Sequence, residues 1–138
     1  MKVILVGAGL HAKAVVEAVV AQGHEIACYA DPQPCNWLDA PHIASDRPPA
    51  DSGAQGFVLG IGGTAPESLR HRLELFAAYA AEGLAAPAIV HPAAYVSPGT
   101  RLGAGAIVLA RAVLQPDAAV GRAAIVNTGA IVEHDSVI

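Results

Sequence analysis

The sequence predicts an α/β protein in two unlike parts, a small parallel-sheet domain over residues 1–88 and a parallel β-solenoid over residues 89–138. Short aliphatic runs alternate with helix-like segments up to about residue 83, as in βαβ units. Beyond that point an aliphatic residue recurs at every sixth position, and a small residue follows each one four places on. A fixed period of this kind indicates a repeat architecture, because neither a helix nor a single strand has a period of six.

The chain opens with an aliphatic strand over residues 2–6, a Gly7-Ala8-Gly9 turn and a helix over residues 12–22. Glycines at such a turn let the backbone approach a ligand, and the free N–H groups of the helix start favour a phosphate. A second strand stops at Asp31, at a spacing where an acidic residue commonly contacts a ribose or a base. The dinucleotide fingerprint is incomplete because Ala12 replaces its third glycine. The turn therefore indicates either nucleotide binding or close packing alone.

A loop is expected over residues 31–56, which are rich in Pro, Ala, Asp and Ser. A strand over residues 57–61 follows and runs into a second glycine turn, Gly60-Ile61-Gly62-Gly63. Two glycine turns at the carboxyl ends of parallel strands would face one crevice, where open α/β sheets bind their ligands.

The last element before the repeats is a helix expected over residues 66–83. Its apolar residues predict an inward side made of Leu69, Leu73, Phe76, Ala77 and Ala80. Arg70, His71 and Arg72 would then lie on a partly solvated side.

The hexads run from residue 90 to residue 138, and their aliphatic positions are Val90, Val96, Leu102, Val108, Leu114, Val120, Val126, Val132 and Ile138. Three hexads would make one triangular coil, with the aliphatic residue in the bore and the small one near a corner. Glycines and prolines between them fit the corners. These residues supply only roughly two and a half coils without a polar cap, where solenoids normally need about three repeats. The chain is therefore expected to be an incomplete piece of a longer protein.

Composition argues against several classes of function. The net charge is −4 and no Lys/Arg cluster is present, so a nucleic-acid partner is not expected. No segment approaches the roughly 18 apolar residues of a membrane span, so no membrane partner is expected. Cys28 and Cys35 suggest neither a disulfide framework nor a zinc site. The prediction is a reduced, cytoplasmic setting without a bound metal.

These residues resemble the hexapeptide-repeat sugar acetyltransferases, in the branch that acetylates nucleotide-linked amino sugars. The resemblance covers essentially the whole chain and rests on segments 7–11, 60–63 and 127–135, together with Asp31, Arg70 and His91-Pro92. It implies a Rossmann-like domain that binds the nucleotide of a UDP-sugar or similar substrate. It also implies a left-handed β-helix that forms a homotrimer and binds acetyl-CoA as co-substrate, in glycan biosynthesis. Because the complete relatives continue for several further coils that hold acetyl-CoA, the 138-residue piece itself is expected to lack acetyltransferase activity.

The resemblance also implies two sets of site residues. His134 would be the catalytic base, because imidazole titrates in the range needed to take a proton from an attacking amine. Asp135 would orient it, although Glu133 is a second candidate from the residues alone. The nucleotide sugar would be bound by Gly7, Gly9, Leu10, His11, Asp31, Gly62, Gly63 and Arg70.

Three departures from the family pattern affect the nucleotide side. Leu10 precedes the histidine where Gly or Ser is usual, Asp31 stands without a second acid, and the turn around Thr64 is longer. Three alternatives stay open: a sialic acid O-acetyltransferase, a non-catalytic module in which the solenoid serves only assembly, and a nicotinamide-dependent oxidoreductase built on the first glycine turn. The third is disfavoured, because a solenoid follows residue 90 where a substrate domain would be needed. In the second case Glu133-His134-Asp135 would be a solvated polar corner.

Overall fold

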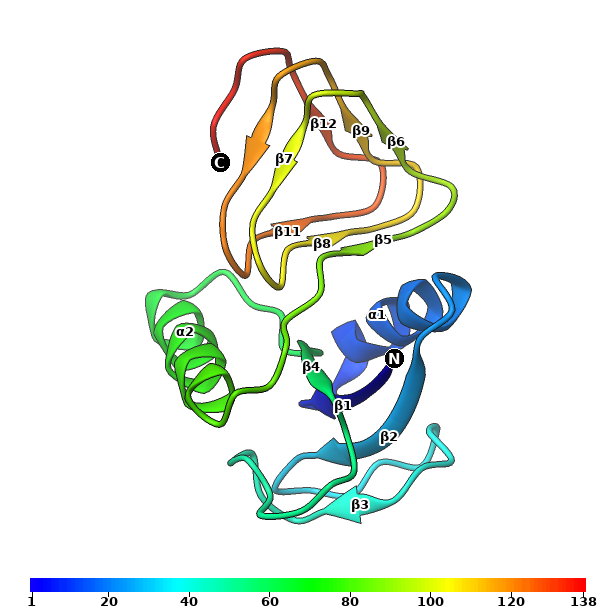
Figure 1. Ribbon diagram of the computed structural model, residues 1–138, viewed down its shortest axis with the longest axis vertical. Helices are drawn as coiled ribbons and strands as arrows, with labels where there is room; N and C mark the ends of the chain where they lie inside the picture. The colour runs from blue at the N-terminus through cyan, green and yellow to red at the C-terminus, as the bar shows by residue number, and fades with distance from the viewer.

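The computed structural model describes residues 1–138, and its N-terminal part is a four-stranded parallel sheet between two helices (Figure 1). The helices are α1 (Leu10–Ala21) and α2 (Pro66–Ala81). The sheet order is β3-β2-β1-β4, from strands His42–Ile43, Glu25–Ala30, Lys2–Val6 and Gly56–Leu59. All its pairings are parallel. Neither helix has the length and apolar character needed to cross a membrane.

Alternation along β1 divides the core between the two faces of the sheet. Val3 and Leu5 pack with α1, whereas Ile4 and Val6 pack with α2. All four side chains are fully buried, because successive residues of a strand point to opposite faces and a helix covers each face. The sheet is therefore the middle layer of three.

The inward side of α2 differs from the predicted one. Its buried residues are Arg72, Leu75, Phe76 and Tyr79, whereas Leu69 is 42% exposed and Leu73 is 51% exposed. The aromatic rings fix this rotation, because Phe57 of β4 packs against both Phe76 and Tyr79 at centroid distances of 5.3 and 5.2 Å. Apolar residues occur around most of this helix, so their period did not identify the buried side.

Eight two-residue strands follow, and they form three parallel stacks with a triangular outline (Figure 1). Paired residues lie eighteen positions apart, as Ile89 with Ile107 and Ile107 with Ile125. This spacing confirms that three hexads make one coil. The strands are β5 Ile89–Val90, β6 Tyr95–Val96, β7 Arg101–Leu102, β8 Ile107–Val108, β9 Val113–Leu114, β10 Ala119–Val120, β11 Ile125–Val126 and β12 Ile131–Val132.

The aliphatic hexad positions from Val90 to Val132 fill the bore as one cluster, with Val108 and Leu114 fully buried. Ile138 is the exception and is 50% exposed. The small residues also point inward, because Ala106, Ala112 and Ala118 are fully buried in the same cluster. Two sides of the triangle converge at each of these positions, which leaves room for little more than a methyl group.

Each corner of the solenoid after β6 contains one residue in the left-handed backbone region. These residues recur at every sixth position: Gly99, Gly105, Arg111, Asp117, Ala123, Gly129 and Asp135. The four that are not glycine have φ between 56° and 61°, a conformation that costs roughly 1–2 kcal/mol for most L-residues and less for Asp. The chain turns sharply at each of these corners, and this conformational cost arises only at the four that are not glycine.

The two parts share a core. Ile89 and Ile107 are fully buried on the outward side of β5 and β8, where they join the cluster formed by α1 and β1. The N–H of Val90 also donates to Gln22 Oε1 at 2.9 Å. Figure 1 shows this side of the triangle resting on α1 and the sheet. The solenoid is thereby fixed next to the carboxyl ends of β1 and β4.

Candidate functional site

The two glycine turns and the start of α1 enclose a cavity of about 380 Å³. It lies at the carboxyl ends of β1 and β4, where parallel sheets bind ligands. The predicted substrate-binding residues other than Arg70 all line it, together with Gly60 and Ile61: Gly7, Gly9, Leu10, His11, Asp31, Gly62 and Gly63.

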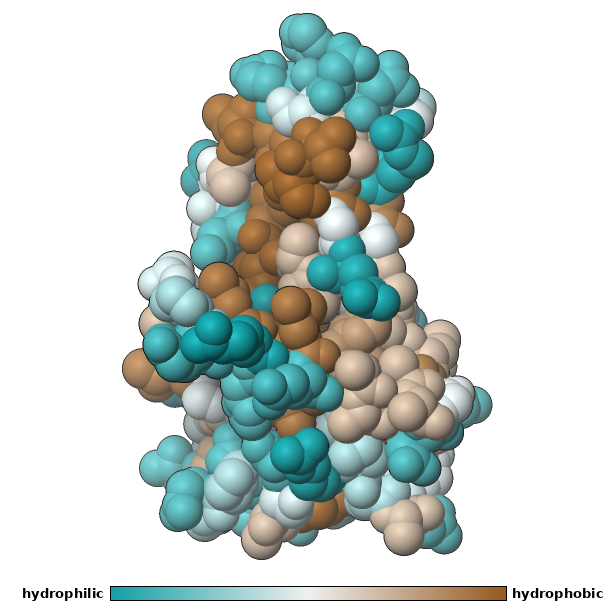
Figure 2. All heavy atoms as spheres, turned by 90° about the vertical axis from the view of Figure 1, so that its left-hand side faces the viewer, coloured by the Kyte–Doolittle hydropathy of each residue, from teal (hydrophilic) through white to brown (hydrophobic).

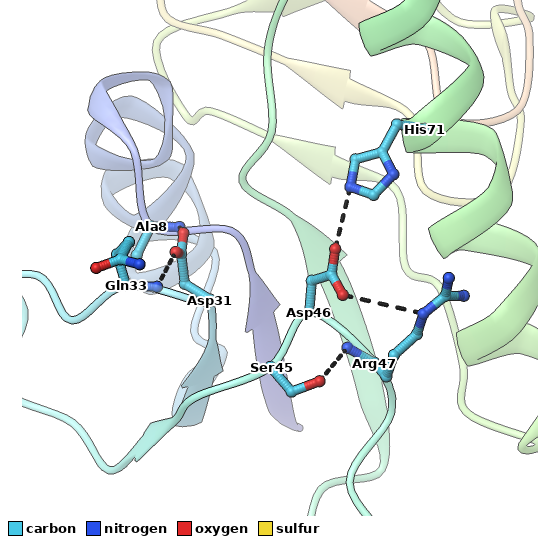
Figure 3. Close-up of polar contacts among 7 residues, drawn as sticks. All are labelled: Ala8, Asp31, Gln33, Ser45, Asp46, Arg47 and His71. Carbon is cyan, nitrogen blue, oxygen red and sulfur yellow. Dashed lines mark hydrogen bonds and ion pairs between the residues drawn. The ribbon is translucent and has the colours of Figure 1, made fainter.

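Asp31 ties the first glycine turn to the end of β2. Its carboxylate accepts the backbone N–H of Ala8 and that of Gln33, both at 2.8 Å (Figure 3). These bonds hold the first glycine turn beside the end of β2 at one wall of the cavity. Gly9 precedes α1 without any side-chain cap, so the first N–H groups of the helix face an opening that suits a negatively charged group.

A second cavity of about 300 Å³ lies between α1, α2 and the third coil. It shares His11, Gly62 and Gly63 with the first cavity and is otherwise lined by Thr64, Leu69, Arg72, Ala124, Ile125 and Asn127. The two cavities therefore meet at the histidine and the second glycine turn.

Arg70, the predicted ligand on α2, lies outside both cavities. Its side chain is 69% exposed and pairs with Glu67 at 3.8 Å. Arg72 lines the second cavity instead, because α2 is rotated so that the Leu75, Phe76 and Tyr79 side is buried. Arg72 is one helical turn from Leu75 and Phe76 and therefore lies on the same side of α2.

His134 and Asp135 form a hydrogen-bonded pair on an outer corner, 2.9 Å from Nδ1 to Oδ2. Both side chains are exposed, at 73% and 76%. The hydrogen bond to Asp135 and then its negative charge raise the pKa of His134 above its ordinary value, with Glu133 adding a smaller effect. Because Nδ1 faces the carboxylate, Nε2 is the ring nitrogen that points away from Asp135. Asp135 has φ 59°, which Asp tolerates better than most residues.

The structure does not bring this pair to the glycine turns. Neither His134 nor Asp135 lines either cavity next to His11. The chain after β12 runs along the vertex of the triangle that lies away from the α/β part (Figure 1). Figure 2 shows this end of the molecule covered by hydrophilic residues.

Three solved structures match almost the whole chain. The acetyltransferase domain of PglB from Neisseria gonorrhoeae FA1090 has a TM-score of 0.85 and 30% identity, covering 99% of this chain and 66% of that one. The same domain in complex with acetyl coenzyme A has a TM-score of 0.82 at the same identity and coverage. PerB from Caulobacter crescentus, in complex with CoA and GDP-perosamine, has a TM-score of 0.83 and 32% identity, covering 98% of this chain and 64% of that one.

The chain belongs to the hexapeptide-repeat sugar N-acetyltransferases. It spans just under two thirds of the length of these structures. No family model and no curated protein sequence matches it.

Two polar groups of this family member were not predicted from the sequence. Arg72 is one, and the other is a side-chain pair in which Asp46 lies 3.1 Å from His71 Nε2 (Figure 3). Asp46 also lies 4.0 Å from Arg47 Nε. These contacts attach the loop after β3 to α2 outside both cavities. They could not be predicted from the sequence, because Asp46 and His71 are far apart along the chain. No cluster of His, Cys, Asp and Glu is arranged to bind a metal ion.

Adding a methyl group at Gly60 or at Gly9, both of which line the first cavity, is expected to change stability by very different amounts. A Cβ on Gly60 would clash with Gly7 O and lie 2.8 Å from Ala12 Cβ, so Gly60→Ala should lower the free energy of unfolding by about 1–3 kcal/mol. A Cβ on Gly9 meets nothing within 4 Å, and its φ of −72° suits alanine. Gly9→Ala should therefore leave stability within about 0.5 kcal/mol of wild type.

Urea unfolding of the two variants separates these effects. Equal losses of stability in the two variants would contradict the close packing of the two turns.

Proposed function

We propose that this protein transfers an acetyl group from acetyl-CoA to the amino group of a nucleotide-linked amino sugar. The observation that carries the proposal is the match at 30–32% identity, over 98–99% of this chain, to the PglB acetyltransferase domain and to PerB. PerB was solved with CoA and GDP-perosamine, and the PglB domain with acetyl coenzyme A. The cavity at the glycine turns is the proposed site for the nucleotide.

In this proposal His134 acts as the general base. Acetyl-CoA would supply the activated acetyl group as a thioester. His134 Nε2 would take a proton from the amine as its nitrogen attacks, and the imidazolium would return that proton to the departing sulfur. Asp135 would hold Nδ1 in the protonated tautomer and stabilise the positive ring. No nucleophilic Ser or Cys is needed, because the amine attacks directly.

We further propose that the catalytic pair and the nucleotide cavity meet between subunits. Since His134 lies away from both cavities of its own chain, the acceptor would reach the histidine of another copy in a homotrimer. The outward side of β6 and β12 carries Tyr95 and Ile131, 56% and 64% exposed, which fits a subunit contact. Light scattering should then give a mass of three chains.

The finer architecture belongs to the same proposal. Residues 1–88 would be a Rossmann-like nucleotide-sugar domain, and residues 89–138 the first coils of a left-handed β-helix. The parallel order β3-β2-β1-β4 and the eighteen-residue pairing support these assignments. The free thiols of Cys28 and Cys35 are compatible with a reduced, cytoplasmic setting.

Thiol release from acetyl-CoA by a chain extended through the further coils of the β-helix tests the function. GDP-linked and UDP-linked 4-amino sugars are offered as acceptors, because PerB was solved with a GDP-linked sugar whereas the sequence suggested UDP. Turnover with either, and none with the free amino sugar, is the expected result. Sialic acid as acceptor tests the O-acetyltransferase alternative. Absence of thiol release with all acceptors would refute the proposal.

A further inference from the structure

Arg72 is a buried cation without a partner in this chain. Its side chain lies within α2, the residue is 5% exposed, and neither Nε nor Nη2 has a hydrogen-bond partner. It forms no ion pair with a carboxylate. Burial lowers the pKa of Arg72, but a guanidinium stays protonated near neutral pH. An unpaired buried charge is costly, so this side chain is suited to a ligand that brings negative charge.

The surroundings of Arg72 fit an anion and offer no competing acid. The second cavity has no Asp or Glu among its lining residues. His11 lines the same cavity, and its Nε2 is also buried without a partner. Burial and then the charge of Arg72 lower the pKa of His11, so the ring is neutral near pH 7 and can donate a hydrogen bond from Nε2.

The position of Arg72 and His11 indicates which kind of anion they would bind. His11, Gly62 and Gly63 line both cavities, so a ligand that occupies the first cavity continues past them towards Arg72. The unpaired N–H groups at the start of α1 lie on the same route. A planar guanidinium binds two oxygens of one phosphoryl group side by side. We propose that Arg72 and His11 form a phosphoryl-binding subsite where the two cavities meet.

The ligand assigned to this subsite is the diphosphate of a nucleotide-linked sugar. This identity rests on the proposed function, whereas the phosphoryl chemistry rests on the two unpaired side chains. The nucleoside would lie in the first cavity and the sugar in the second, beside Asn127 of the third coil.

Calorimetric titration of Arg72→Met tests the subsite with four probes: guanosine, GDP, inorganic pyrophosphate and sulfate. We expect wild type to bind GDP more tightly than guanosine. Arg72→Met should weaken GDP and pyrophosphate roughly 10- to 100-fold and leave guanosine unchanged. Arg72→Lys keeps the positive charge but lacks the paired N–H donors of the planar guanidinium. Its affinity for GDP should therefore lie between those of wild type and Arg72→Met. Arg101→Met removes an exposed arginine outside both cavities and serves as the charge control.

Thermal unfolding separates a binding role from a packing role. Without ligand, Arg72→Met should unfold at a temperature equal to or above that of wild type, because it removes a buried unpaired charge. GDP should raise the Tm of wild type and not that of the variant. A lower Tm without ligand, or unchanged GDP affinity in Arg72→Met, would overturn the subsite. Wild type that binds sulfate or pyrophosphate as tightly as GDP would overturn the nucleotide as its ligand. Arg72-dependent GDP binding without acetyl transfer would remove the proposed function alone.

Discussion

His134→Ala is expected to lower kcat for acetyl transfer roughly 10²- to 10⁴-fold, the range that a general base contributes. The KM values for acetyl-CoA and the nucleotide sugar should change little, because His134 lies in neither cavity next to His11. Thiol release under saturating substrates measures the change. Unchanged turnover would favour the non-catalytic alternative.

A second histidine provides a matched control. His71 also pairs with a carboxylate, Asp46 at 3.1 Å, but lies outside both cavities on α2. His71→Ala should therefore keep full turnover. A loss in both variants would indicate damage to the fold rather than to catalysis.

The pH profile gives an independent test of the pair. Asp135 raises the pKa of His134, so the fraction of unprotonated base and hence kcat should rise as pH increases through a value above 6.5. In Asp135→Asn the negative charge is lost, so the rise of kcat with pH, the acid limb of the profile, should move to lower pH. Any stability from the pair is present below about pH 6.5 and is lost as pH rises through the raised pKa. An acid limb at the same pH in both proteins would contradict this role for Asp135.

Ile107→Ala is expected to lower the free energy of unfolding by about 2–5 kcal/mol. Ile107 is fully buried in the cluster that joins β8 to α1 and β1. The variant should lose stability in one cooperative transition, because a single core serves both parts. Urea unfolding followed by circular dichroism measures it.

Leu73→Ala is the control, since Leu73 is an aliphatic residue of α2 that is 51% exposed and lies outside both cavities. Its cost should stay below about 1 kcal/mol. Equal costs at the two positions, or two separate transitions in Ile107→Ala, would show that the solenoid and the sheet do not share a core.

The solenoid was predictable because its signal is local and repeated. Each hexad shows the same aliphatic position, so Val108 and Leu114 could be assigned to the bore without tertiary information. The glycine turns were equally readable, since strand, turn and helix follow one another directly. The position of Arg72 was not readable, because the contact of Phe76 with Phe57 sets the rotation of α2 and depends on residues far apart in the sequence. Val20 of α1 is 57% exposed for the same reason, because packing against the sheet selects Val15 and Val19.

The recurring left-handed corners separate the residues that specify this fold from those that are free to vary. The bore admits only aliphatic and small side chains, whereas the corners away from the α/β part fix a backbone angle and leave their side chains exposed; Ala123, by contrast, packs with α2. Arginine, aspartate, alanine and glycine all occupy equivalent corners here. A reactive group can therefore be gained, lost or moved by eighteen residues along one edge without repacking the interior. Such a scaffold allows new acceptor chemistry to evolve by substitution at its edges while its interior stays unchanged.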